Sequence, residues 1–182
     1  ELALVVLTAV IGTGSFLFHT FATPWARLAD TGPIGIFMIA YLAYALRRFA
    51  GLGAVATGLW MAAFVGSLVA AASVTCGAAA CLNGSLGYVP ALVALVVVGS
   101  ATARRRHPAA RPLLLAAVLF LASLAFRTVD RMVCPYTIIV AARSVGTHFL
   151  WHLLNAAMLL VLLHATVRHG RPATPERHAR SA

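Results

Sequence analysis

The chain consists mainly of long apolar runs that end at clusters of arginine, proline and glycine. A transmembrane helix needs about 20 mostly apolar residues, and its backbone must satisfy its hydrogen bonds internally because lipid offers no partners. Six segments qualify, at residues 2–21, 33–50, 54–74, 87–103, 111–128 and 144–168. The sequence therefore predicts an all-α fold, a polytopic bundle of six transmembrane helices.

Composition supports a single membrane domain. Charged residues make up only 10% of the chain, whereas a soluble domain carries about a quarter. The connections between the apolar runs are short, so we expect residues 1–169 to form one bundle. Residues 170–182 are polar and contain two prolines, which predicts a disordered cytoplasmic tail.

The positive charge of the chain predicts its orientation. The formal net charge is +10, but the arginines stand at the ends of apolar runs, which argues against a nucleic-acid-binding face. They concentrate after the second, fourth and sixth runs, at Arg47, Arg48, Arg104, Arg105, Arg106, Arg111, Arg168, Arg171, Arg177 and Arg180. Positive loops favour the cytoplasm, so these junctions and the C-terminus are predicted to be cytoplasmic. Arginine in place of lysine, with abundant alanine, is typical of a GC-rich bacterial genome. We therefore expect the protein to lie in a bacterial cell membrane.

The three cysteines all fall on the predicted outer side, where disulfides persist. Cys76 and Cys81 can close a small loop, which leaves Cys134 over. Three reduced thiols are the alternative.

Five polar residues stand out within the apolar sequence. They are Ser15, His19, Asp30, His148 and His152. The serine and the first histidine are four residues apart, as are the last two histidines, so each pair shares a helix face. The predicted topology puts all five near the outer ends of their helices. Ionisable groups are costly in a bilayer unless they have partners, so the group predicts a functional site.

Three histidines with a carboxylate predict a metal site that uses His19, His148 and His152 as ligands. Zinc held by three protein nitrogens keeps a fourth position open for water, as in hydrolytic centres. Asp30 can take a proton from this water and pass it to the leaving group. Alternatively, Asp30 orients one of the ligands.

Each of these residues also has a purely structural interpretation. The histidines can bond neighbouring helices, Ser15 can donate to its own helix, and Asp30 can cap a helix that begins near Pro33. We expect Asn155 to bond across helices rather than to support the site. Convergence of the five polar residues in one layer favours the metal site.

Two stretches resemble the alkaline ceramidases, whose superfamily also contains the adiponectin-receptor-like membrane proteins. Residues 14–20 (GSFLFHT) carry a Ser and a His four apart, followed by Asp30 eleven residues later. Residues 147–154 (THFLWHLL) carry two His four apart and follow Asp130 and Cys134. The eleven-residue interval is typical of the ceramidase branch, because the receptor-like branch has a longer gap.

The resemblance implies a seven-helix membrane amidase, of which this chain lacks the first helix. The zinc would be held by His19, His148 and His152. Asp30 would assist the attack of water on a lipid amide, and Ser15 would form a hydrogen bond near the developing oxyanion. The implied substrate is ceramide or another N-acyl lipid, which enters sideways from the membrane.

Two other functions remain open from the residues alone. One is a lipid-binding receptor or sensor of the adiponectin-receptor-like type, in which the zinc is structural. The other is a membrane protein without enzymatic activity, whose histidine cluster relays protons.

Overall fold

The computed structural model describes residues 1–76, 81–137, 139–140, 143–144 and 146–170. Within these residues, six helices are long and apolar enough to cross a membrane. They are α1 (Leu2–Phe21), α2 (Pro24–Arg48), α3 (Ala54–Ser73), α4 (Val89–Arg104), α5 (Ala110–Val133) and α6 (His148–His169). The predicted all-α, multi-pass membrane fold is confirmed. The predicted tail lies outside the described residues after Gly170.

Short elements connect the helices at the end of the bundle where α1 ends and α6 begins. They are η1 (Cys81–Gly84), η2 (Leu86–Tyr88), η3 (Cys134–Tyr136) and the antiparallel strands β1 (Ile139–Val140) and β2 (Arg143–Ser144). A disulfide joins Cys76 to Cys81, which is one of the two alternatives that the sequence left open.

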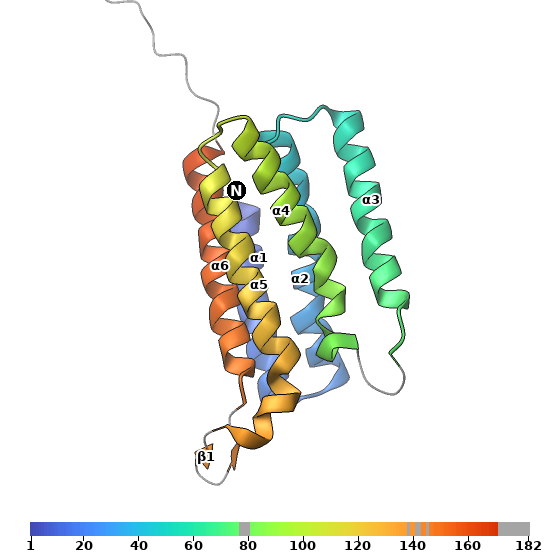
Figure 1. Cartoon of the computed structure of the whole chain (residues 1–182), viewed down its shortest axis with the longest axis vertical. Coiled ribbons are helices and arrows are strands. Elements are labelled where there is room, and N and C mark those ends of the chain that lie inside the picture. Colours follow the sequence, from blue (N-terminus) through green and yellow to red (C-terminus); the bar gives the residue numbers. More distant parts are fainter. Residues whose placement is uncertain (77–80, 138, 141–142, 145, 171–182) are drawn as a thin grey trace, which may run out of the picture.

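The helices run side by side along the length of the bundle (Figure 1). α1 packs along α2, α4 packs along α5, and α5 packs along α6, whereas α1 and α6 touch at few points. α3 stands at the edge of the bundle beside α2 and α4 (Figure 1). The core between the other helices is apolar and includes the fully buried Leu113 of α5. The bundle is therefore least tightly closed between its first and last helices.

Two helix boundaries differ from the prediction in ways that affect the site. α2 begins at Pro24, which occupies the first turn, where its missing N–H costs nothing. Asp30 consequently lies inside the helix, and its interpretation as an N-cap near Pro33 is wrong. α5 continues to Val133, beyond the predicted end at residue 128, so Asp130 lies on this helix and not in a connection.

The close crossing of α1 and α2 depends on two residues that face each other. Pro33 lies inside α2 and has no N–H, so the carbonyl of Ala29 loses its usual helical donor. Gly14 of α1 lies against this carbonyl, and a Cβ atom at Gly14 would overlap the carbonyl oxygen. The glycine therefore allows close approach of the two backbones beside Ser15.

Gly14→Ala should destabilise the fold, because the added methyl group meets backbone that cannot move aside. Overpacking of this kind costs about 1–3 kcal/mol, so we expect a lower melting temperature in detergent. Gly12→Ala is the matched control, since a Cβ atom there meets nothing within 4 Å. Equal melting temperatures for the two variants would contradict the assigned packing.

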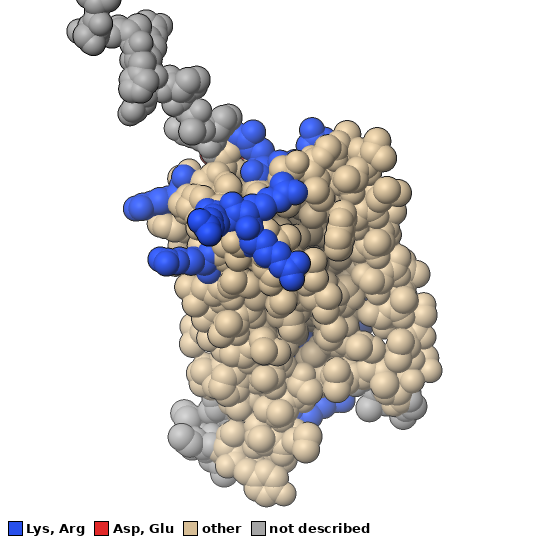
Figure 2. Space-filling model, turned by 45° about the horizontal axis from the view of Figure 1, so that its top comes forward, with Lys and Arg blue, Asp and Glu red and all other residues tan. Residues whose placement is uncertain are grey.

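Arginine side chains gather at the other end of the bundle, where α2, α4 and α6 end (Figure 2). Arg48 donates from Nε to the carbonyl of Gly170 over 2.8 Å, which ties the end of α2 to the end of α6. Arg105 donates to the carbonyl of Ala50 and so ties the end of α4 to the α2–α3 connection. The two ends of the bundle thus differ sharply in charge.

Candidate metal centre

Three histidines meet at the end of the bundle opposite these arginines. His19 comes from the last turn of α1, and His148 and His152 come from the start of α6. The Nε2 atoms of His19 and His152 are 2.9 Å apart. One ring nitrogen from each histidine lies within 4.8 Å of the other two. The structure thus brings together two histidines adjacent on α6 and one more than a hundred residues away in the sequence.

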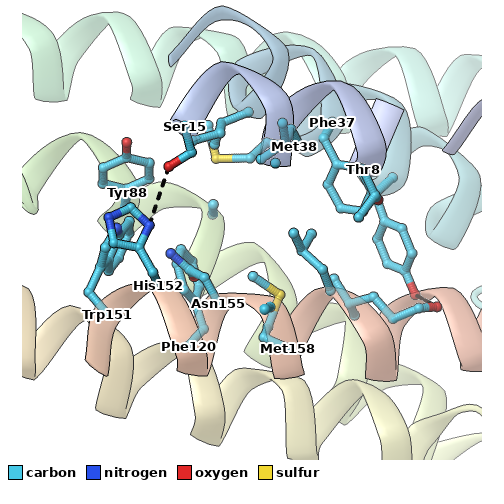
Figure 3. A pocket seen from close by; sticks show the side chains of 18 of the residues that line it. Thr8, Ser15, Phe37, Met38, Tyr88, Phe120, Trp151, His152, Asn155 and Met158 are labelled. Atoms are coloured by element: carbon cyan, nitrogen blue, oxygen red, sulfur yellow. Dashed lines mark hydrogen bonds between the residues drawn. The ribbon is translucent and has the colours of Figure 1, made fainter. Parts of the chain in front are cut away.

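Ser15 contacts the histidine group from α1. Its Oγ lies 3.4 Å from Nδ1 of His152 (Figure 3). Nε2 of the same ring faces His19. When Nε2 serves as a metal ligand, Nδ1 carries the ring proton, and this N–H donates a hydrogen bond to the serine oxygen. Hydrogen bonds of this kind fix the tautomer and the orientation of a ligating histidine. Ser15 therefore stands where it can orient His152.

The start of α6 is fastened to the end of α5 directly before His148. The backbone N–H of Thr147 donates to Asp130 Oδ1 over 2.6 Å, and its hydroxyl donates to the carbonyl of Phe126 over 2.9 Å. Gly146 has a φ of +64°, and a Cβ atom there would lie 2.6 Å from the Asp130 carboxylate. Asp130 thus acts through Thr147. Its contact fixes the position and direction of the first turn of α6, where His148 lies next to the other two histidines.

Asp30 of α2 lines the same cavity as the three histidines. Its side chain is half-buried, and no hydrogen bond or ion pair joins it to another described residue. The carboxylate is consequently available to a water molecule or a ligand beside the histidines. Asp30 and Ser15 therefore both lie at the site, as the sequence predicted for its five polar residues.

A cavity of about 780 Å³ extends from the histidines into the bundle. Ser15, Tyr88 and His152 lie at one end, and apolar side chains including Met38 and Met158 follow (Figure 3). At the other end the buried Tyr41 donates its hydroxyl to the carbonyl of Leu162 over 3.1 Å. The cavity is therefore a long apolar space with its ionisable groups at one end.

The lipid-facing side of this cavity lies between α1 and α6. Phe16 of α1 and Leu160 of α6 both line the cavity and are each 69% exposed. These are the two helices that touch at few points. The flank between α1 and α6 thus carries exposed apolar side chains that also line the cavity.

Three cavity-lining residues near the histidines were not assigned to the site by the sequence. Arg127 of α5 lies over the rings of Trp151 and Tyr88, with its Cζ 4.8 Å and 5.5 Å from their centroids. Trp151 is buried and packs in the core. The repeated spacing of the histidines gave a signal in the sequence, whereas a single arginine beside an apolar run gave none.

Asn155 lies one turn beyond His152 and also lines the cavity (Figure 3). Its Oδ1 is buried without a hydrogen-bond partner in the described part of the chain. The interhelical hydrogen bond expected from the sequence is therefore not formed through this oxygen. An uncommitted amide of this kind is suited to bind a polar group of a ligand.

The histidine group fits a zinc ion by its donors and by its size. Tetrahedral zinc bound at 2.0–2.1 Å places its nitrogen ligands about 3.3 Å apart. The observed nitrogen separations begin at 2.9 Å and do not exceed 4.8 Å. Three imidazoles can hold a metal ion here, at one end of the cavity.

The chain matches no protein-family model, no curated protein and no solved structure.

Proposed function

We propose that this protein is an integral-membrane, zinc-dependent hydrolase that cleaves the amide bond of a ceramide-like N-acyl lipid. The observation that carries the proposal is the group of three histidine nitrogens at the polar end of a long apolar cavity. Its volume of about 780 Å³ is in the range of cavities that bind small molecules. The apolar part suits an acyl chain, and the histidines meet the end of the lipid where the amide lies.

The residues at the site would divide the chemistry between them. A zinc ion held by His19, His148 and His152 would supply an activated water and polarise the amide carbonyl. Asp30 would take the proton of the attacking water and deliver it to the amide nitrogen, which leaves as an amine. The products are a fatty acid and the amine of the headgroup.

Ser15 has two possible tasks in this reaction. The resemblance to alkaline ceramidases implies a hydrogen bond to the developing oxyanion. Its contact with Nδ1 of His152 favours a positioning task, in which the serine keeps Nε2 of this ring turned toward the metal.

The charge at the two ends of the bundle supports an orientation. Short positive junctions favour the cytoplasmic side, so the arginine-rich end would face the cytoplasm together with the C-terminus. The histidines would then lie near the outer face, in a bacterial cell membrane. The exposed flank between α1 and α6 would admit the acyl chain from the lipid phase.

The release of fatty acid from labelled ceramide by purified protein in micelles tests the proposal. We expect release by the zinc-loaded protein, loss of release with a chelator, and recovery when zinc is restored. His164→Ala is the matched control, because His164 lies on α6 but is exposed and does not line the cavity. This variant should retain wild-type activity.

Two other results would replace the proposal. Zinc binding and lipid binding without turnover would indicate a receptor or sensor of the adiponectin-receptor-like type. A purified protein that binds no metal would indicate a proton-relay histidine cluster.

A further inference from the structure

We propose that Arg127, with Arg27 as the second cationic residue that lines the cavity, binds an anionic group of the lipid headgroup. Among ceramide-like N-acyl lipids, the preferred substrate would then be an N-acyl amino acid, which has a free carboxylate, over a neutral ceramide. This inference rests on the proposed function, since it names the headgroup of the same substrate.

The guanidinium of Arg127 is held in place by two aromatic rings. Its Cζ lies 4.8 Å from the ring centroid of Trp151 and 5.5 Å from that of Tyr88. Trp151 directly precedes His152, and all four residues line the cavity. Contacts with aromatic rings use the face of a guanidinium and leave the N–H groups at its edge for hydrogen bonds. The arginine is therefore positioned beside the metal centre with its donors available.

The donors of Arg127 lack partners within the part of the chain that the structure describes. Its Nε is buried without a hydrogen bond, and no ion pair joins the guanidinium to a carboxylate. A cationic side chain at membrane depth normally pairs with an acid or a carbonyl. Asp130, one turn further along α5, is already bonded to Thr147. The missing partner of Arg127 is thus best supplied by a ligand.

The charges around the cavity favour an anion. Arg27 of α2 and Arg127 of α5 line it, and Asp30 is the carboxylate among its lining residues. A bound zinc ion would add further positive charge, so the polar end of the cavity attracts an anionic group. The hydroxyl groups of ceramide carry no charge to balance these arginines. An N-acyl amino acid places a carboxylate two bonds beyond the amide nitrogen, on the headgroup side of the scissile bond.

Equilibrium binding to the purified full chain separates this idea from the hydrolase proposal. The probes are N-palmitoylglycine and its uncharged primary amide, measured in a chelator so that neither a metal ion nor turnover contributes. Charge-assisted hydrogen bonds are worth enough to predict about ten- to a hundredfold tighter binding of the acid. Arg127→Gln should remove most of this preference. Arg131→Gln is the matched control, because Arg131 lies one turn away on α5, is exposed and does not line the cavity.

Palmitate, the fatty-acid product, serves as the third probe because its carboxylate derives from the amide carbonyl. We expect Arg127→Gln to weaken N-palmitoylglycine binding much more than palmitate binding. An equal loss of affinity for both probes would mean that Arg127 binds the carboxylate of the fatty-acid product, and would overturn the proposal. Equal binding of the acid and the amide to the wild-type protein would overturn it as well. If the acid is preferred in an arginine-dependent way but no hydrolysis occurs, the anion site is supported and only the proposed amidase activity is contradicted.

Discussion

His152→Ala is expected to abolish zinc binding and, with it, the release of fatty acid. The loss of outer hydrogen-bonding partners alone lowers metal affinity about 10- to 100-fold, so the loss of one of three ligands should exceed this range. His152 also contacts both site residues of α1, since its Nε2 faces His19 and its Nδ1 faces Ser15. The zinc content after purification should fall from about one per chain to nearly zero.

A change in folding must be separated from this loss of a ligand. His164→Ala removes a histidine from the same helix but away from the cavity, so its zinc content should equal that of the wild type. Ser15→Ala should show an intermediate result, with weakened but measurable zinc binding, because it leaves all three ligands in place. Full zinc occupancy in the His152→Ala protein would contradict the assigned ligand set.

Asp30→Asn is expected to lower the rate of amide hydrolysis about 10²- to 10⁴-fold, which is the usual contribution of a general acid or base. The asparagine side chain has nearly the shape of the aspartate carboxylate but cannot accept the proton of the attacking water. Asp30 forms no hydrogen bond or ion pair with a described residue, so its replacement should leave both the melting temperature and the zinc content unchanged. The measurement is kcat for fatty-acid release by zinc-loaded protein.

Asp130→Asn provides the contrast to this variant. Asp130 holds Thr147 at the start of α6, so its substitution should lower the melting temperature and weaken zinc binding through His148. We therefore expect the Asp30→Asn and Asp130→Asn variants to differ in melting temperature, in zinc content and in kcat. A loss of zinc in Asp30→Asn equal to that in Asp130→Asn would argue against Asp30 as a proton carrier.

The sequence predicted the helices well where the apolar runs were uninterrupted. The first run was predicted at 2–21 and is observed as Leu2–Phe21. The prediction failed where polar residues continue a helix. The run predicted at 111–128 stopped before Asp130 and Arg131, but the backbone remains helical to Val133. Hydropathy measures lipid solubility, and it cannot distinguish a helical turn that carries charged side chains from a loop.

The start of α2 shows a second limit. The segment around Pro33 has the composition of a helix start, and Pro24 offers the same signal nine residues earlier. Packing decides between them, because Gly14 of α1 covers the carbonyl that Pro33 leaves without a donor. A contact between two helices is not visible in the sequence of either one.

The candidate site was predictable in part because its geometry repeats within helices. Residues four apart share a face, and this periodicity pointed to the pairs that contain His19 and His152. The environment of Arg127 depends on rings from α6 and η2 that lie 24 residues ahead and 39 residues behind it in the sequence. Such a position follows only from the tertiary fold.

The most direct test of the account is X-ray absorption at the zinc edge on the purified wild-type protein. The account predicts about one zinc per chain, bound by three imidazole nitrogens at about 2.0–2.1 Å and one oxygen. A protein that carries no zinc after purification and takes up none on addition, or zinc bound without imidazole ligands, would contradict it.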